Sequence, residues 1–135
     1  MFRIASLDHL VLNVSDTDRS LAFYGDTLGL AQERVAEFKR GEVPFPSVRV
    51  NADTIIDLFP PNMHGPRDGG NNLNHLCFTV EAESQELRAL LCAVGLHIDR
   101  VASENMGARG VGSSYYVSDP DGNSVELKTY SIGAK

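Results

Sequence analysis

Each half of the sequence contains a histidine followed by a carboxylate at nearly the same distance along the chain. His9 precedes Asp57 by 48 residues, and His75 precedes Glu126 by 51 residues. Two imidazoles with one or two carboxylates, and with positions left for water or substrate, suit divalent Ni, Zn, Mn, Co or Fe. We therefore predict that His9, His75, Glu126 and Asp57 hold one divalent metal ion. Because aspartate is shorter than glutamate, Asp57 could bind the ion directly, act through water, or accept a supporting hydrogen bond.

The elements expected to position these side chains form an internal repeat. Residues 8–30 read DHLVLNVSDTDRSLAFYGDTLGL, and residues 74–96 read NHLCFTVEAESQELRALLCAVGL. In each copy a histidine opens an apolar stretch typical of a strand, a helix-like segment follows, and a glycine stands 20 residues after the histidine. Three strand-like runs follow each glycine, at residues 30–38, 46–51 and 54–59 and at residues 96–102, 111–117 and 123–129.

The repeat predicts an α+β fold built from paired βαβββ modules that form a cupped mixed sheet. The modules span residues 1–60 and 73–130, and the segment 61–72 between them is rich in Pro, Gly and Asn, which is typical of a linker. A module of about 60 residues buries little core alone. We therefore expect both modules to pack into a single domain, residues 1–135.

Local signals mark the ends of the expected helices. Ser15 followed three residues later by Asp18 resembles a capping box, which predicts Ser15 as the helix N-cap. Gly29 suits the left-handed conformation that ends many helices. The second helix is predicted to be amphipathic, because apolar residues recur at i, i+3, i+4 and i+7, namely Leu87, Leu90, Leu91 and Val94.

Side chains alternate across a strand, so the strand pattern predicts which residues share the open face of each sheet. Opposite the helices we expect two alternating sets from the first strands, His9, Val11 and Asn13, and His75, Cys77 and Thr79. On the last strands Asp57, Phe59 and Glu126 are expected on the same face. One of the adjacent residues Tyr115 and Tyr116 must also point there, and Tyr116 is the candidate.

Composition excludes several classes of function. The chain has 135 residues, 42% hydrophobic and 22% charged, which is the balance of a globular protein. Its net charge of −6 disfavours nucleic acid and anionic membrane as partners. No signal peptide or membrane-length apolar run is evident, and the two cysteines have no Cys-x-x-Cys spacing. We expect a reduced, cytoplasmic protein.

Three segments, residues 7–14 (LDHLVLNV), 23–30 (FYGDTLGL) and 119–127 (DPDGNSVEL), resemble the vicinal oxygen chelate superfamily over essentially the whole chain. That group contains glyoxalase I, fosfomycin-resistance proteins, extradiol dioxygenases and bleomycin-resistance proteins. The resemblance implies a cupped sheet around one metal and a homodimer. It also implies metal ligands at His9, His75 and Glu126, with Asp57 at a position where glyoxalase I carries glutamate. The turn at residues 119–122 positions Glu126, since Pro120 presets φ and Gly122 tolerates positive φ.

Further residues are candidates for binding the substrate. Asn13 stands at the position where bacterial glyoxalase I carries an arginine that holds glutathione. Few basic side chains are expected near the cleft, and Arg109 is the one cation predicted to lie there. Asn13 and Thr79 could donate hydrogen bonds, Phe59 could line the cup, and Tyr116 could donate a proton or simply line the rim. We expect Cys77 to be a small buried residue, with a thiolate ligand as the alternative, and we expect His64 and His97 to lie at the surface.

Two functions compete at this point. The first is a metal-dependent lyase, isomerase or dioxygenase, in which two neighbouring oxygens of a small-molecule substrate bind the metal and Glu126 or Asp57 acts as the base. The second is a non-catalytic protein that sequesters a small molecule, as in the bleomycin-resistance branch. The retained histidines and Glu126 favour the first.

Overall fold

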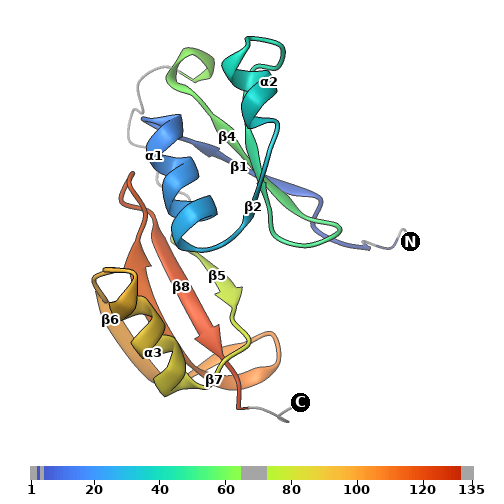
Figure 1. Cartoon of the computed structure of the whole chain (residues 1–135). Helices are drawn as coiled ribbons and strands as arrows, with labels where there is room; N and C mark the ends of the chain where they lie inside the picture. Colours follow the sequence, from blue (N-terminus) through green and yellow to red (C-terminus); the bar gives the residue numbers. More distant parts are fainter. Residues whose placement is uncertain (1–2, 4, 65–72, 132–135) are drawn as a thin grey trace. The chain divides into compact units, whose positions relative to one another are not determined.

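A computed structural model describes residues 3, 5–64 and 73–131 of the chain. It divides into two compact units, residues 1–70 and 71–135. Figure 1 shows that each unit consists of one sheet with helices. The predicted linker 61–72 falls largely outside the described residues. Of its described part, residues 61–64, Pro61–Met63 forms a short 3-10 helix.

Unit 1 begins with strand β1 (His9–Asn13), which leads into helix α1 (Thr17–Leu21) and a π-helical continuation, η1 (Ala22–Thr27). The chain then forms β2 (Ala31–Glu33), helix α2 (Val35–Lys39), β3 (Ser47–Arg49) and β4 (Ile55–Phe59). The strand order is β1-β4-β3-β2. β1 pairs with β4 in parallel, whereas the β3–β4 and β2–β3 pairs are antiparallel.

Unit 2 repeats the strand plan of unit 1 without a counterpart of α2 among its described residues. Strand β5 (His75–Thr79) is followed by helix α3 (Ser84–Ala93) and then by β6 (Arg100–Gly107), β7 (Gly110–Ser118) and β8 (Ser124–Thr129). The order is β5-β8-β7-β6, again with one parallel pair, β5–β8, and two antiparallel pairs. The predicted α+β class with paired βαβββ units is confirmed, and the module boundaries remain a prediction.

The core of each unit lies between its sheet and its longer helical segment. α1 contacts β4 in unit 1, and α3 contacts β7 in unit 2. The buried apolar side chains alternate along the strands as predicted, and they include Leu12, Val14, Ile56, Leu58, Val117, Val125 and Leu127. The intervening residues of β1 and β5 are exposed, which leaves His9 and His75 on the faces opposite the helices.

The turns follow the predicted glycine chemistry. Gly29 and Gly95, both 20 residues after a histidine, take positive φ values of 83° and 77° after their helices. Gly122 has φ 81°, and its amide donates a hydrogen bond to the Asp119 carbonyl. The Asp119 carboxylate accepts from the amides of Asp121 and Asn123. This closed turn leads directly into β8, which carries Glu126.

Several predicted boundaries were wrong. The N-cap of α1 is Asp16 rather than Ser15, because the Asp16 carboxylate accepts the Arg19 amide. The run 30–38 is not one strand. Arg34 adopts φ 63°, which ends β2 and starts α2. β6 begins at Arg100 instead of residue 96 and continues to Gly107, because it pairs with β7 along a long hairpin.

The predicted apolar face of α3 is narrower than the sequence pattern indicated. Leu87 and Leu91, one helical turn apart, are buried, whereas Leu90 and Val94 are about half exposed. The reason is that the helix is ten residues long and meets the sheet along a single i, i+4 stripe. Among the described residues, none of the helices is long and apolar enough to cross a membrane.

Candidate metal centre

In unit 2 the predicted ligands His75 and Glu126 lie side by side. His75 starts β5 opposite Ser124, and Glu126 sits two residues further along β8 on the same face. The His75 Nε2 atom is 3.1 Å from Oε1 of Glu126. The other ring nitrogen, Nδ1, is 2.6 Å from Oδ1 of Asn74, the preceding residue. The imidazole is therefore held through Nδ1, with Nε2 directed towards the carboxylate.

Glu126 is buried, and hydrogen bonds hold one of its two oxygens. Its Oε2 accepts from Ser114 Oγ at 2.6 Å and from Asn105 Nδ2 at 2.9 Å. Asn105 reaches this oxygen from β6, just after a register shift between Ala102 and Asn105. Burial raises the pKa of Glu126, but the bonds from Ser114, Asn105 and Tyr116, with the nearby Lys128 charge, outweigh it and lower the pKa overall. The carboxylate is therefore ionised, with Oε1 facing His75.

A buried lysine completes this network. Lys128 is almost fully buried, and its Nζ donates to the Asn105 carbonyl at 3.0 Å, to Asn105 Oδ1 and to Ser114 Oγ at 3.3 Å. The same Nζ lies 3.7 Å from Glu126 Oε2. A Cβ at Gly107 would come within 2.5 Å of the Lys128 Cε atom. The glycine therefore makes room for the lysine stem against the β6–β7 hairpin.

Unit 1 places His9 and Asp57 in the corresponding positions. His9 pairs with Ile55, and Asp57 lies two residues further along β4 on the same face. The His9 Nδ1 atom is 2.8 Å from the Asp8 carboxylate, again the preceding residue. This hydrogen bond raises the pKa of His9, and the charges of Asp57 and Asp8 add to the rise, although partial desolvation opposes it. His9 is therefore held through Nδ1, as His75 is.

The carboxylate of Asp57 is buried and has one oxygen occupied. Its Oδ1 accepts from Ser47 Oγ at 2.6 Å and lies 3.3 Å from Nη2 of Arg34. The Arg34 guanidinium carbon also lies 5.1 Å from the centroid of the Phe45 ring. Asp57 is therefore paired with a cation in unit 1, whereas Glu126 is held mainly by neutral donors in unit 2.

These donor sets suit a divalent metal ion. Histidine ligands of metals are commonly fixed by a hydrogen bond from the second ring nitrogen to a carboxylate or carbonyl oxygen. Asp8 and Asn74 supply such an oxygen to His9 and His75. Within the described parts of the chain, no group of three His, Cys, Asp or Glu side chains is close enough to hold an ion. Each unit by itself brings together one histidine and one carboxylate.

A cavity of about 220 Å³ adjoins His75. Its lining comprises Asn74, His75, Asp99, Arg100, Tyr116 and Ser124. The rings of His75 and Tyr116 meet edge to face with centroids 5.9 Å apart, and the Tyr116 hydroxyl accepts from Asn105 Nδ2 at 3.3 Å. Tyr115 points to the other face, where its hydroxyl contacts Ser84. Tyr116 is therefore the tyrosine on the histidine face, as predicted.

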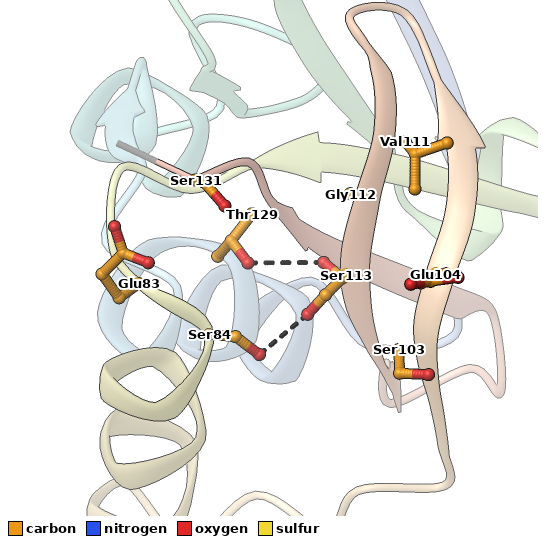
Figure 2. Close-up of a pocket in the computed structure, with 9 residues that line it drawn as sticks. All are labelled: Glu83, Ser84, Ser103, Glu104, Val111, Gly112, Ser113, Thr129 and Ser131. Atoms are coloured by element: carbon orange, nitrogen blue, oxygen red, sulfur yellow. Dashed lines mark hydrogen bonds between the residues drawn. The ribbon is translucent and has the colours of Figure 1, made fainter. Parts of the chain in front are cut away.

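A second cavity, of about 240 Å³, lies on the helix side of the same sheet. Figure 2 shows its lining, which consists mostly of hydroxyl groups with Glu83 and Glu104. Ser113 stands at its centre: its Oγ is 2.8 Å from Ser84 Oγ, and its carbonyl accepts from Thr129 at 3.4 Å. Ser113 and Thr129 alternate with Ser114 and Lys128 along their strands, so the two cavities lie on opposite faces.

The remaining predicted residues divide into two groups. Asn13 and Thr79 are exposed on the faces that carry His9 and His75, and the Phe59 ring packs 4.7 Å from that of Phe45. Arg109 lies in the turn of the β6–β7 hairpin, where its guanidinium carbon is 5.6 Å from the Tyr130 ring centroid. Within the part of the chain that the structure describes, Arg109 contacts Tyr130 and none of the candidate ligands.

Other expectations need correction. Cys77 is exposed rather than buried, because it shares the open face of β5 with His75. His64 is partly buried, because its Nε2 lies 3.0 Å from the Val14 carbonyl oxygen. His97 is exposed as predicted.

The expectation that Arg109 is the one cation near the site was also wrong. Arg34, Arg100 and Lys128 contact candidate site residues. The sequence contains a signal that could have identified Arg34 and Arg100. Arg34 and Arg100 each stand five residues after the glycine that ends the repeat.

The fold and the pairing of a histidine with a carboxylate in each unit define a class of protein. The chain belongs to the Glyoxalase/Bleomycin resistance protein/Dioxygenase superfamily, whose family model matches residues 6–127. The predicted resemblance to this superfamily is therefore confirmed.

Particular relatives cover nearly the whole chain. The Virulence protein STM3117 of Salmonella typhimurium is 29% identical over 94% of this chain and 85% of its own length. Its crystal structure matches with a TM-score of 0.77 over 96% of this chain and 99% of that chain, at 25% identity. The Glyoxalase domain-containing protein RDO1 of Mycosarcoma maydis is 31% identical, covering 94% and 69% of the two chains. The Glutathione transferase FosA of Serratia marcescens is 30% identical, covering 98% and 86%.

Proposed function

We propose that the protein is a metal-dependent enzyme that binds one divalent ion through His9, His75 and Glu126 and acts on a small molecule with two neighbouring oxygens. The observation that carries this proposal is the identical register of the two units. In each unit, the first strand pairs in parallel with the strand that carries the buried carboxylate. The histidine stands two residues before the residue that pairs with this carboxylate. In each, the residue before the histidine holds Nδ1.

The chemistry of the donors supports these roles. Neutral imidazole nitrogen and carboxylate oxygen are ligands that Ni, Zn, Mn, Co and Fe accept. The lowered pKa of Glu126 keeps its carboxylate ionised at neutral pH, as a ligand must be. When bound, the ion would supply Lewis acidity to the substrate oxygens.

Asp57 is the proposed general base. Its Oδ1 is occupied by Ser47 and Arg34, whereas Oδ2 has no such contact within the described residues. A carboxylate fixed through one oxygen can accept a proton, or a bond to the ion, through the other. Arg34 and Ser47 would then position Asp57, while Glu126, held by Ser114 and Asn105, serves as the metal ligand.

Metal stoichiometry tests the proposal. Protein purified without added metal, and then titrated with Ni, Mn, Fe or Zn, should bind one equivalent per chain. His75→Ala should lose at least tenfold in affinity, whereas His97→Ala, which removes an exposed histidine, should bind as the wild type does. Binding below about 0.2 equivalents, with no gain on adding metal, would overturn the enzyme proposal and favour a sequestering protein. Full binding by His75→Ala would refute the ligand assignment.

A further inference from the structure

We propose that Arg100 binds an anionic group of the substrate, so that the substrate is a small acid carrying a second carboxylate besides its two metal-binding oxygens. This inference rests on the proposed metal site and specifies its substrate class. It concerns the cavity of about 220 Å³ that Arg100 shares with His75 and Tyr116.

Arg100 and His75 both contact the ring of Tyr116. The Arg100 guanidinium carbon is 4.3 Å from the Tyr116 centroid, and the His75 centroid is 5.9 Å from it. Contact with the face of this ring restrains the Arg100 guanidinium without using its N–H groups, and a carboxylate can accept two hydrogen bonds from such a group. The candidate ligand and the cation therefore line one cavity.

The repeat supplies an internal comparison. Arg34 stands in unit 1 at the same distance from its glycine as Arg100 does in unit 2, and it too lies over an aromatic ring. Arg34 uses Nη2 on Asp57 and Ser47. Among the described residues, by contrast, no carboxylate comes within ion-pair distance of the Arg100 guanidinium. Arg100 thus keeps donors that Arg34 has already used.

The one carboxylate lining the cavity is engaged elsewhere. Asp99 Oδ2 accepts from Ser118 Oγ at 2.6 Å, and Oδ1 lies 3.9 Å from His97 Nε2. Asn74 and Ser124, the remaining polar lining residues, are neutral. With a divalent ion held by His75 and Glu126, the charges around the cavity favour an anion, although the whole chain is acidic.

A pair of simple acids tests the assignment. Malate and lactate both present an α-hydroxycarboxylate to a metal, but only malate carries a distal carboxylate. With metal-loaded protein, titration calorimetry should show malate binding about ten times more tightly than lactate or better, as expected for a charge-assisted hydrogen bond. Arg100→Gln should remove this preference and leave lactate affinity unchanged. Arg88→Gln, a change at an exposed position of α3, should keep it.

The outcomes separate the two proposals. Metal content is measured first, for the wild-type chain and for each variant. A wild-type chain that binds no metal refutes the proposed function, and the assignment of Arg100 is then refuted as well. If metal binds but malate and lactate bind equally, or neither binds, the assignment of Arg100 is wrong. It is also wrong if the preference for malate survives in Arg100→Gln.

Discussion

Lys128 offers the sharpest test of the network that holds Glu126. Replacing it with methionine keeps most of the side-chain volume but removes the ammonium group. Glu126 then stays buried without its nearest cation, 3.7 Å away, and Asn105 and Ser114 lose a donor. Removing one partner of a buried ion pair typically costs 3–5 kcal/mol. Because Ser114 and Asn105 still bind Glu126, we expect the lower part of that range, about 3 kcal/mol.

Urea unfolding followed by circular dichroism measures this loss. Lys128→Met, Glu126→Gln and the double variant form a cycle, in which the double variant should be more stable than the sum of the single losses predicts. The ammonium helps to lower the pKa of Glu126. A carboxyl group with a lowered pKa stabilises the fold above its ordinary pKa, and this contribution is lost as the pH falls through the folded value. The penalty of Lys128→Met should therefore shrink in acid. A variant within about 0.5 kcal/mol of wild type at neutral pH would refute the reasoning.

Three further predictions concern single residues. Asp8→Asn should lower the pKa of His9, because the hydrogen bond to the Asp8 carboxylate is the largest cause of its rise, and an NMR titration of the imidazole showing no fall would contradict this. Gly107→Ala should destabilise the protein by about 1–3 kcal/mol in thermal or urea unfolding, because the new Cβ would lie 2.3 Å from the Tyr130 hydroxyl. Unchanged stability would contradict this prediction and show that the β6–β7 hairpin or the Tyr130 side chain moves to accommodate the methyl group. Leu91→Ala should lower the free energy of unfolding by about 2–4 kcal/mol in the same assay, because Leu91 is buried, whereas Leu90→Ala should lower it by under about 1 kcal/mol. Equal losses of stability would contradict the assignment of Leu87 and Leu91 as the buried face of α3.

Much of the fold could be predicted because it depends on local and periodic signals. The spacing of histidine and glycine revealed the repeat, alternation placed His9 and His75 on the open faces, and Gly29 and Gly95 marked the helix ends. All of these depend on properties of single residues or on strand and helix periods. The same signals correctly placed Glu126 between buried apolar neighbours.

The rest depends on tertiary geometry that has no local signature. Arg34 ends a strand with a left-handed backbone that nothing in its residue type indicates. Asn105 reaches Glu126 only because β6 shifts its register against β7. Lys128 would be expected at the surface from its type, yet it is buried because Asn105, Ser114 and Glu126 satisfy its charge. Such pairings join residues on different strands and follow only from the assembled sheet.

A crystal structure of the full chain grown with added zinc or nickel tests the central claim most directly. We expect one ion per chain, with the Nε2 atoms of His9 and His75 about 2.0–2.1 Å from the metal and Glu126 binding through Oε1. Open coordination positions should face the substrate. An ion bound elsewhere, separate ions in the two units, or a metal-free site at saturating metal would contradict it.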